Sequence, residues 1–240
     1  MRIIAAVALA VLLAGYARSA AAQARDGQVE TGSATQGERK AYRPGELYLP
    51  GSRVFVHVSK TGLGHEHAVI GGVSQGSLNL GAEDNAGEIV FDMQSFRADT
   101  EAARKYLGLS GATSASAQRE TTANMLGSSV LNADEFPTAV FKIASARLHP
   151  KRSRRDLPQY ELQGEFTLHG VTRPLNVLAE AEPVKGWQRV RGSFAINQTD
   201  FGIKPFTKAF GAIGVADRLT IWGDVLVAAG AGVARAAAPR

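Results

Sequence analysis

Residues 138–148 read TAVFKIASARL. In this stretch Phe141 and Ile143 fall on one face of an extended chain, and Lys142 falls on the other. Successive side chains of a β-strand point to opposite faces, so the alternation predicts a strand with one buried face. Residues 159–168, QYELQGEFTL, repeat the pattern and predict a second strand.

The same alternation recurs along most of the chain. Five further stretches are rich in β-branched and aromatic residues and are divided by Gly or Pro: SRVFVHVS (52–59), GEIVFDMQSF (87–96), PLNVLAEAE (174–182), RVRGSFAI (189–196) and DRLTIWGDVLVA (217–228). Residues 99–131 instead favour helix, with Gly108 and Gly111 as interruptions. We therefore predict a mostly antiparallel β domain with a helical insertion near its middle. Seven or eight such strands can stack as a sandwich or close into a barrel, and the alternation fits both.

The two ends of the chain differ from this domain. Residues 1–24 combine Arg2, a short apolar run and the sequence Ala22-Gln23-Ala24, which together predict a secretory signal peptide cleaved near Ala24. Residues 25–44 and 229–240 are expected to be a flexible leader and a flexible tail around a domain at 45–228. We expect an exported protein of the bacterial periplasm.

Composition and charge exclude several classes of function. The chain has no cysteine, which excludes disulfides, thiolate metal sites and thiol nucleophiles. The 27 Lys and Arg residues exceed the 22 Asp and Glu residues by five, and signal cleavage would remove two arginines and no acid. The remaining excess of three is too small to indicate a nucleic-acid partner.

Two segments carry a resemblance to a known family. DEFPTAVFKIAS (134–145) and GEFTLHGVTRPLNV (164–177), in this order, resemble the paired motifs of the YceI-like polyisoprenoid-binding family. NQTDFGI (197–203) and DRLTIWGDV (217–225) extend the resemblance, which runs roughly from residue 47 to residue 227. It implies an antiparallel, eight-stranded, lipocalin-like barrel that encloses a polyisoprenoid or similar lipid in an apolar tunnel. A barrel of this strand number has room for packed side chains or for one slim ligand.

Strand parity selects the residues that would line such a tunnel. On each strand the apolar face supplies the candidates, and Met125 and Leu126 of the helical insertion are expected to cover one end. The inward candidates are Val54, Val56, Val58, Phe91, Met93, Phe141, Ile143, Phe166, Leu168, Phe194 and Ile196.

Residues 62–72, GLGHEHAVIGG, hold two histidines between glycine-rich ends. His65 and His67 are two residues apart, so in a strand they share one face, with Glu66 on the other. Two imidazoles without a third ligand do not make a metal site, and His57 or His169 would have to supply it. We predict that His65 and His67 lie at the tunnel mouth and contact a ligand head group, with no metal bound.

Two other patterns are assigned no function. Residues 72–76, GVSQG, match the G-x-S-x-G nucleophile pattern but lack the helix that the motif requires after the serine. Residues 151–155, KRSRR, form a basic run where a hairpin loop belongs. We interpret the run as a solvated loop, with transient attraction to an anionic membrane surface as the alternative.

The sequence thus favours a non-catalytic periplasmic lipid carrier without a cofactor. It leaves open whether two copies assemble into a homodimer. The first alternative is a metal-binding protein or metal-dependent enzyme centred on His65 and His67. The second is a packed β domain that serves only as an interaction module.

Overall fold

The computed structural model describes residues 41–229. The predicted signal peptide, residues 25–40 of the leader and residues 230–240 of the tail lie outside the described residues. Tyr42, which we had assigned to the leader, packs its ring edge-on against Trp187 and Tyr48, at centroid distances of 4.8 and 5.9 Å. Contacts with the domain therefore begin before residue 45.

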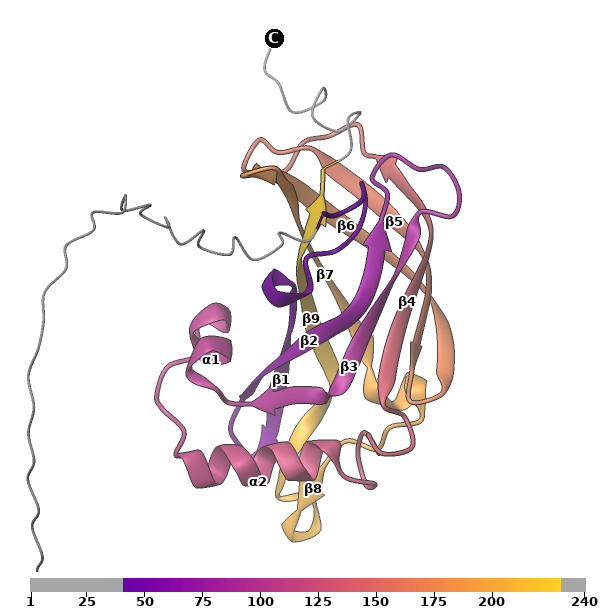
Figure 1. The fold of residues 1–240 in the computed structure, drawn as a ribbon. Helices are drawn as coiled ribbons and strands as arrows, with labels where there is room; N and C mark the ends of the chain where they lie inside the picture. Colours follow the sequence, from indigo (N-terminus) through magenta and orange to yellow (C-terminus); the bar gives the residue numbers. More distant parts are fainter. Residues whose placement is uncertain (1–40, 230–240) are drawn as a thin grey trace, which may run out of the picture. The chain divides into compact units, whose positions relative to one another are not determined.

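Eight long antiparallel strands form a closed barrel, because β1 pairs with β2 on one side and with β9 on the other (Figure 1). This confirms the predicted all-β, eight-stranded architecture and excludes the two-layered sandwich. A two-residue strand, β8 (Thr207–Lys208), adds a short hairpin to β9. The eight strands are β1 (Arg53–Gly62), β2 (His67–Leu78), β3 (Gly87–Ala98), β4 (Thr138–Leu148), β5 (Gln159–Leu168), β6 (Val171–Val184), β7 (Trp187–Asn197) and β9 (Ile213–Ala228).

Strand β2 is the one long strand that the sequence patterns did not reveal. It contains three glycines and few of the residues that favour strands. Its pairing with β3 shifts register twice, between Ile70 and Gly72 and between Val73 and Gln75. Such bulges break the two-residue alternation, which is why β2 was missed.

The helical insertion forms two helices, α1 (Glu101–Leu107) and α2 (Ala115–Leu126). Each begins with a hydroxyl cap: Thr100 accepts a hydrogen bond from the Ala103 amide, and Ser114 accepts one from the Ala117 amide. Helix α1 lies against the outside of β1, where Tyr106 stacks on Phe55 at 3.6 Å. Helix α2 crosses one end of the barrel (Figure 1). Within residues 41–229, no helix is long and apolar enough to span a membrane.

The two ends of the barrel differ. Strand direction places the β2–β3, β4–β5 and β6–β7 connections at one end. There Leu47, only 1% exposed, is bridged to Val227 and donates its amide to the Gly76 carbonyl. The interior of this end is filled by buried apolar side chains that include Leu78, Leu162, Val177 and Val225. We call it the packed end; the opposite end, near α2, holds the cavity described next.

Candidate functional site

The barrel encloses an apolar cavity of about 360 Å³ near α2. Strands β1, β2, β3, β4, β5, β7 and β9 all contribute to its wall, and α2 contributes Met125. Its volume falls within the range of about 300–1,000 Å³ that is usual for small-molecule pockets. Apolar walls with a few polar groups at one side suit a ligand with a hydrocarbon part and a polar end.

Most of the residues selected by parity line this cavity. They are Val54, Val56, Val58, Phe91, Met93, Phe166, Leu168, Phe194 and Ile196. Phe141 and Ile143 do not line it: both are buried in the core outside its wall, and the wall residue that β4 supplies is Ala139. They share the buried face of β4 with Ala139. Whether the nine contact a ligand stays a prediction.

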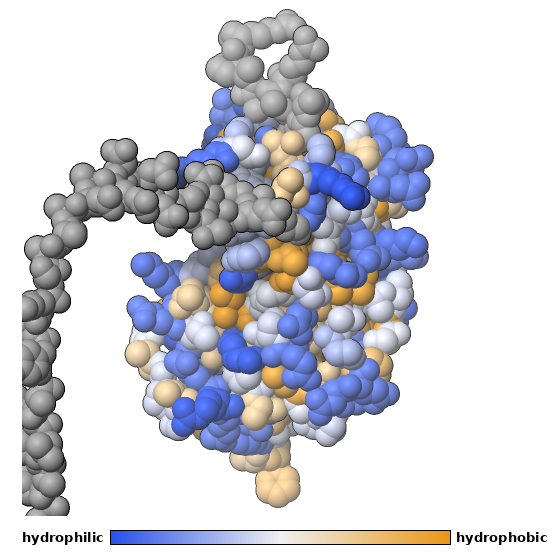
Figure 2. All heavy atoms as spheres, viewed as in Figure 1, coloured by the Kyte–Doolittle hydropathy of each residue, from blue (hydrophilic) through white to orange (hydrophobic). Residues whose placement is uncertain are grey.

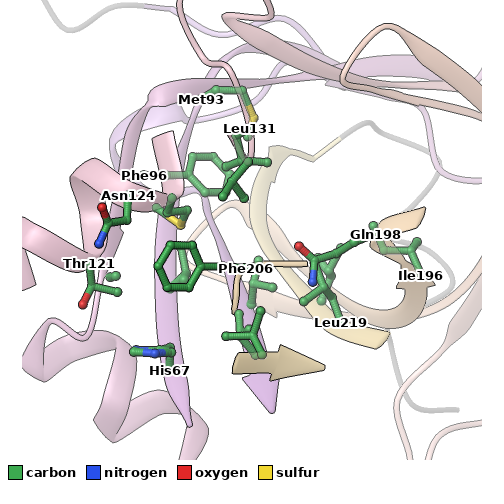
Figure 3. Close-up of a pocket in the computed structure, with 18 of the residues that line it drawn as sticks. His67, Met93, Phe96, Thr121, Asn124, Leu131, Ile196, Gln198, Phe206 and Leu219 are labelled. Atoms are coloured by element: carbon green, nitrogen blue, oxygen red, sulfur yellow. The ribbon is translucent and has the colours of Figure 1, made fainter. Parts of the chain in front are cut away.

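A polar rim surrounds the same cavity on the side of α2. Figure 3 shows Thr121 and Asn124 of α2 on one side and Gln198 on the other, with Phe206 reaching across the space between them. Gln198 is held in place because its side-chain amide donates to the Ala216 carbonyl at 2.8 Å. The remaining polar members of the rim are His65, His67, Glu120 and Lys208.

The orientation of His67 is determined by a buried carboxylate. His67 Nδ1 lies 2.6 Å from Oδ2 of Asp99, which has no exposed surface. Oδ1 of Asp99 accepts from the Ala68 amide and from Arg104 Nη1, each at 3.0 Å. An ionised carboxylate only accepts hydrogen bonds, so His67 Nδ1 carries the hydrogen, and Nε2 is the nitrogen left for a ligand.

These contacts keep Asp99 ionised. Burial alone would raise the pKa of the Asp99 carboxyl, but hydrogen bonds from His67, Ala68 and Arg104 together lower this pKa below its ordinary value. A buried carboxylate with three donors is a stable anchor for the imidazole. The cavity mouth therefore presents a histidine whose ring orientation is preset.

The histidine pair has a third potential metal ligand that differs from the two we had considered. Ligand atoms of His65, His67 and Asp99 lie within 4.8 Å of one another. His57 faces outward and pairs with Glu66 at 3.1 Å, while His169 lies 3.2 Å from the Phe201 carbonyl and packs against Phe136. The two rings of His65 and His67 are 4.5 Å apart. Imidazole and carboxylate ligands suit zinc or copper, although Arg104 opposes a cation bound directly to Asp99.

The site residues predicted from the sequence did not include Asp99, Gln198 and Phe206, although Gln198 lies in a segment that carries the family resemblance. Asp99 and Thr100 are both residues that cap helices, and the sequence offers no way to tell which one does so. Because Thr100 caps α1, Asp99 is free to face His67. Gln198 and Phe206 follow β7 in a segment without alternation, where no periodic signal exists.

The G-x-S-x-G match and the basic run both lie outside the site. Residues 72–76 lie inside β2, so the serine has no strand-turn-helix elbow. The basic run 151–155 lies at the packed end, and two of its arginines are paired. Arg155 contacts Glu180 and Glu182 at 2.7 and 3.0 Å, and Arg152 contacts Asp156 at 2.7 Å.

The fold and the cavity define a class: a closed antiparallel barrel with an apolar chamber at one end and a helix across it. A model of the YceI-like domain matches residues 50–225. The chain belongs to the YceI-like family, as its motifs implied. A comparison with curated proteins gave no match.

Solved structures that resemble this chain include the following three. BcnA of Burkholderia cenocepacia is 17% identical, with a TM-score of 0.48 over 75% of this chain and 99% of its own. A polyisoprenoid binding domain from Saccharophagus degradans, implicated in plant cell wall breakdown, is 10% identical, with a TM-score of 0.49 over 78% and 100%. The Campylobacter jejuni YCEI protein is 12% identical, with a TM-score of 0.43 over 67% and 84%. The family assignment rests on the match to the family model.

Proposed function

We propose that this protein is a periplasmic, non-catalytic carrier that encloses the tail of a polyisoprenoid or similar amphiphile. The observation that carries the proposal is the apolar cavity at one end of an otherwise packed barrel. Each CH₂ group that leaves water for such a cavity stabilises the complex by about 0.8 kcal/mol before the costs of binding. A water-insoluble tail would therefore be held here in preference to the aqueous compartment.

The polar rim suits the head group of the same ligand. His67 Nε2 and the side chains of Thr121, Asn124 and Gln198 lie where the end of a bound chain would emerge from the cavity. A cavity of about 360 Å³ is at the low end of the usual range, so it encloses a short chain or one end of a longer one. Loading and release at a membrane surface follow from this role.

The test compares the lipid content of wild-type protein with that of a cavity-filling variant. Ala139 lines the cavity, so Ala139→Phe should occupy it and reduce the co-purified amphiphile at least about tenfold, the equivalent of roughly 1.4 kcal/mol. Organic extraction and mass spectrometry of protein purified from the periplasm without detergent measure this. The mature chain in the same preparation should begin near residue 25.

Ala144→Phe is the matched control, because Ala144 lies on the same strand with its side chain exposed. It should carry as much amphiphile as the wild type. A wild-type extract without lipid, together with no uptake of a fluorescent polyprenol analogue, would contradict the proposal and favour a packed interaction module.

A second candidate function is metal binding, favoured by the convergence of His65, His67 and Asp99. If this function is real, zinc or copper should bind at one per chain in a calorimetric titration. The combined change His65→Ala and His67→Ala should abolish that binding, whereas His149→Ala, in the loop at the packed end, should not. Binding that is equal in all three proteins would exclude the site.

A further inference from the structure

Two neighbouring loops at the cavity end expose large apolar side chains. Among residues 41–229, Phe210 and Leu63 are the most exposed large hydrophobic residues: Phe210 is fully exposed and Leu63 is 85% exposed. Leu63 belongs to the β1–β2 loop (residues 63–66), and Phe210 belongs to the β8–β9 connection, which includes η3 (Ala209–Gly211). Exposed apolar side chains of this size at one place mark an interaction surface.

The two loops form one structural unit, which we call the apolar tip (residues 61–64 and 207–214). The Leu63 amide donates to the Ala212 carbonyl at 3.0 Å, and Gly62 pairs with Ile213 where β1 meets β9. Gly62 has a φ of +59°, and a Cβ there would lie 2.3 Å from the Ala212 carbonyl oxygen. Glycine thus allows the close approach that holds the two loops together.

The apolar tip projects from the domain. Figure 1 shows the hairpin around β8 extending past α2, at the lowest point of the described chain in that view. The space-filling view shows an apolar protrusion at the same place, with polar side chains around it (Figure 2). The apolar tip is therefore the part of the described chain that projects furthest at the cavity end.

The surroundings of the apolar tip are basic. Lys208 belongs to the tip, and Lys60 and Lys204 precede its two segments in the chain; all three lysines are exposed. Four acids at this end already have partners: Glu66 pairs with His57 and Glu120 lies 3.5 Å from Lys208, while Asp200 accepts from Asn197 and Asp217 accepts from Thr199. Apolar side chains flanked by lysines suit the interface of an anionic membrane, where the apolar groups enter the head-group region and the cations contact phosphate.

The apolar tip also adjoins the cavity. Lys208, Ile213 and Gly214 of the tip line the cavity together with Phe206. A membrane held against the tip would therefore meet the cavity opening directly.

We propose that the apolar tip inserts Leu63 and Phe210 into the interface of an anionic membrane, so that the cavity opening is held against the bilayer. An amphiphile then passes between membrane and cavity without crossing water. The inference rests on the proposed carrier function and specifies its partner and its contact surface. It also moves the membrane contact from the basic run at 151–155 to the opposite end of the barrel.

A second copy of the chain fits the tip less well than a membrane does. Stable protein interfaces bury about 1,200–2,000 Å² in total, far more than two projecting side chains supply. A symmetric contact through the tip would also bring its lysines close to those of the other copy. A fluid interface requires neither a large area nor a complementary shape.

Vesicle co-sedimentation of the mature protein tests the proposal. The wild type should bind vesicles of phosphatidylcholine with phosphatidylglycerol, and weakly those of phosphatidylcholine alone. The double variant Leu63→Ala and Phe210→Ala should bind the anionic vesicles at least about tenfold less, since burial of one large apolar side chain is worth that much or more. Phe210→Trp should still bind. The emission maximum of the introduced tryptophan should shift to shorter wavelength when anionic vesicles are added.

The matched control lies at the packed end. Leu148→Ala combined with Lys151→Gln and Arg154→Gln removes one exposed leucine and two cations, and it should leave vesicle binding unchanged. The proposal is wrong if this control loses binding and the tip variant keeps it. It is also wrong if the wild type does not sediment with anionic vesicles, or if the tip variant only converts a dimer to a monomer.

Uptake of a fluorescent polyprenol analogue, delivered from ethanol, separates this proposal from the carrier function. Leu63 and Phe210 do not line the cavity, so the tip variant should take up as much analogue as the wild type and transfer it more slowly between vesicles. If the wild type takes up none but still sediments, the carrier function fails and the membrane contact stands.

Discussion

At the scale of single residues, Asp99 organises the cavity mouth. It has a left-handed φ of +55°, a conformation that Asp adopts more readily than most residues. This turn between β3 and α1 directs its carboxylate toward His67 and Arg104 rather than into the helix. The buried acid therefore links the end of β3, the start of β2 and helix α1.

Asp99→Asn should destabilise the fold by about 3 kcal/mol at pH 7, the scale for removing one partner of a buried ionic contact. The effect should shrink in acid. Because the folded-state pKa of Asp99 is lowered, its stabilisation is complete above the ordinary Asp pKa of about 3.9 and is lost as pH falls through the folded value. Urea unfolding of both proteins at pH 7, 5 and 3 measures the difference.

Glu101→Gln, an exposed change in the first turn of α1, is the control and should have little effect. Glu161, Glu180 and Asp217 also have lowered pKa values, so the wild type loses stability in acid for several reasons. The relevant quantity is therefore the difference in free energy of unfolding between the wild type and Asp99→Asn. If this difference were the same at pH 7 and pH 3, the proposed role of Asp99 would be wrong.

At the scale of elements, alternation determines the face of a strand but not the height of each residue along the barrel. Ala139, Phe141 and Ile143 all point inward from β4, and two residues along a strand advance about 7 Å. Ala139 lines the cavity, whereas Phe141 and Ile143, further along β4, are buried outside its wall. No pattern within β4 could have revealed where the cavity ends, because side chains from the other strands determine whether the space opposite each residue is filled.

The β4–β5 pair requires a glycine at one position. Gly164 pairs with Ile143 beside a register shift, and a Cβ at Gly164 would lie 2.0 Å from the Lys142 carbonyl oxygen. Gly164→Ala should therefore destabilise the fold by about 1–3 kcal/mol, the usual cost of overpacking. Thermal or urea unfolding gives the value.

Gly223→Ala on β9 is the matched control, since a Cβ there would meet no other atom within 4 Å. It should be neutral, or stabilise the fold by up to about 1 kcal/mol through the unfolded chain. Equal losses in the two variants would show that strand glycines matter here for another reason than the contact with Lys142.

At the scale of the whole molecule, the two ends of the barrel differ in how their interiors are filled. The packed end holds Leu47 and a filled interior, and two arginines of its basic loop are paired with acids. The cavity end has α2, the polar rim and the apolar tip. The cavity is thus confined to one half of the eight strands, and the other half is filled by side chains.

The sequence by itself determined seven of the eight long strands, their buried faces, the helical insertion and the family, because these follow from local alternation and from short motifs. It predicted nine of the residues that line the cavity, and it placed His65 and His67 beside it. Only the tertiary structure decided that the sheet closes, where the hollow ends, and which side chains from distant strands meet. Asp99 reaches His67 across 32 positions of the chain, and Leu63 meets the loop of Phe210 across an even longer separation. Such contacts depend on barrel closure and strand register, which no local pattern encodes.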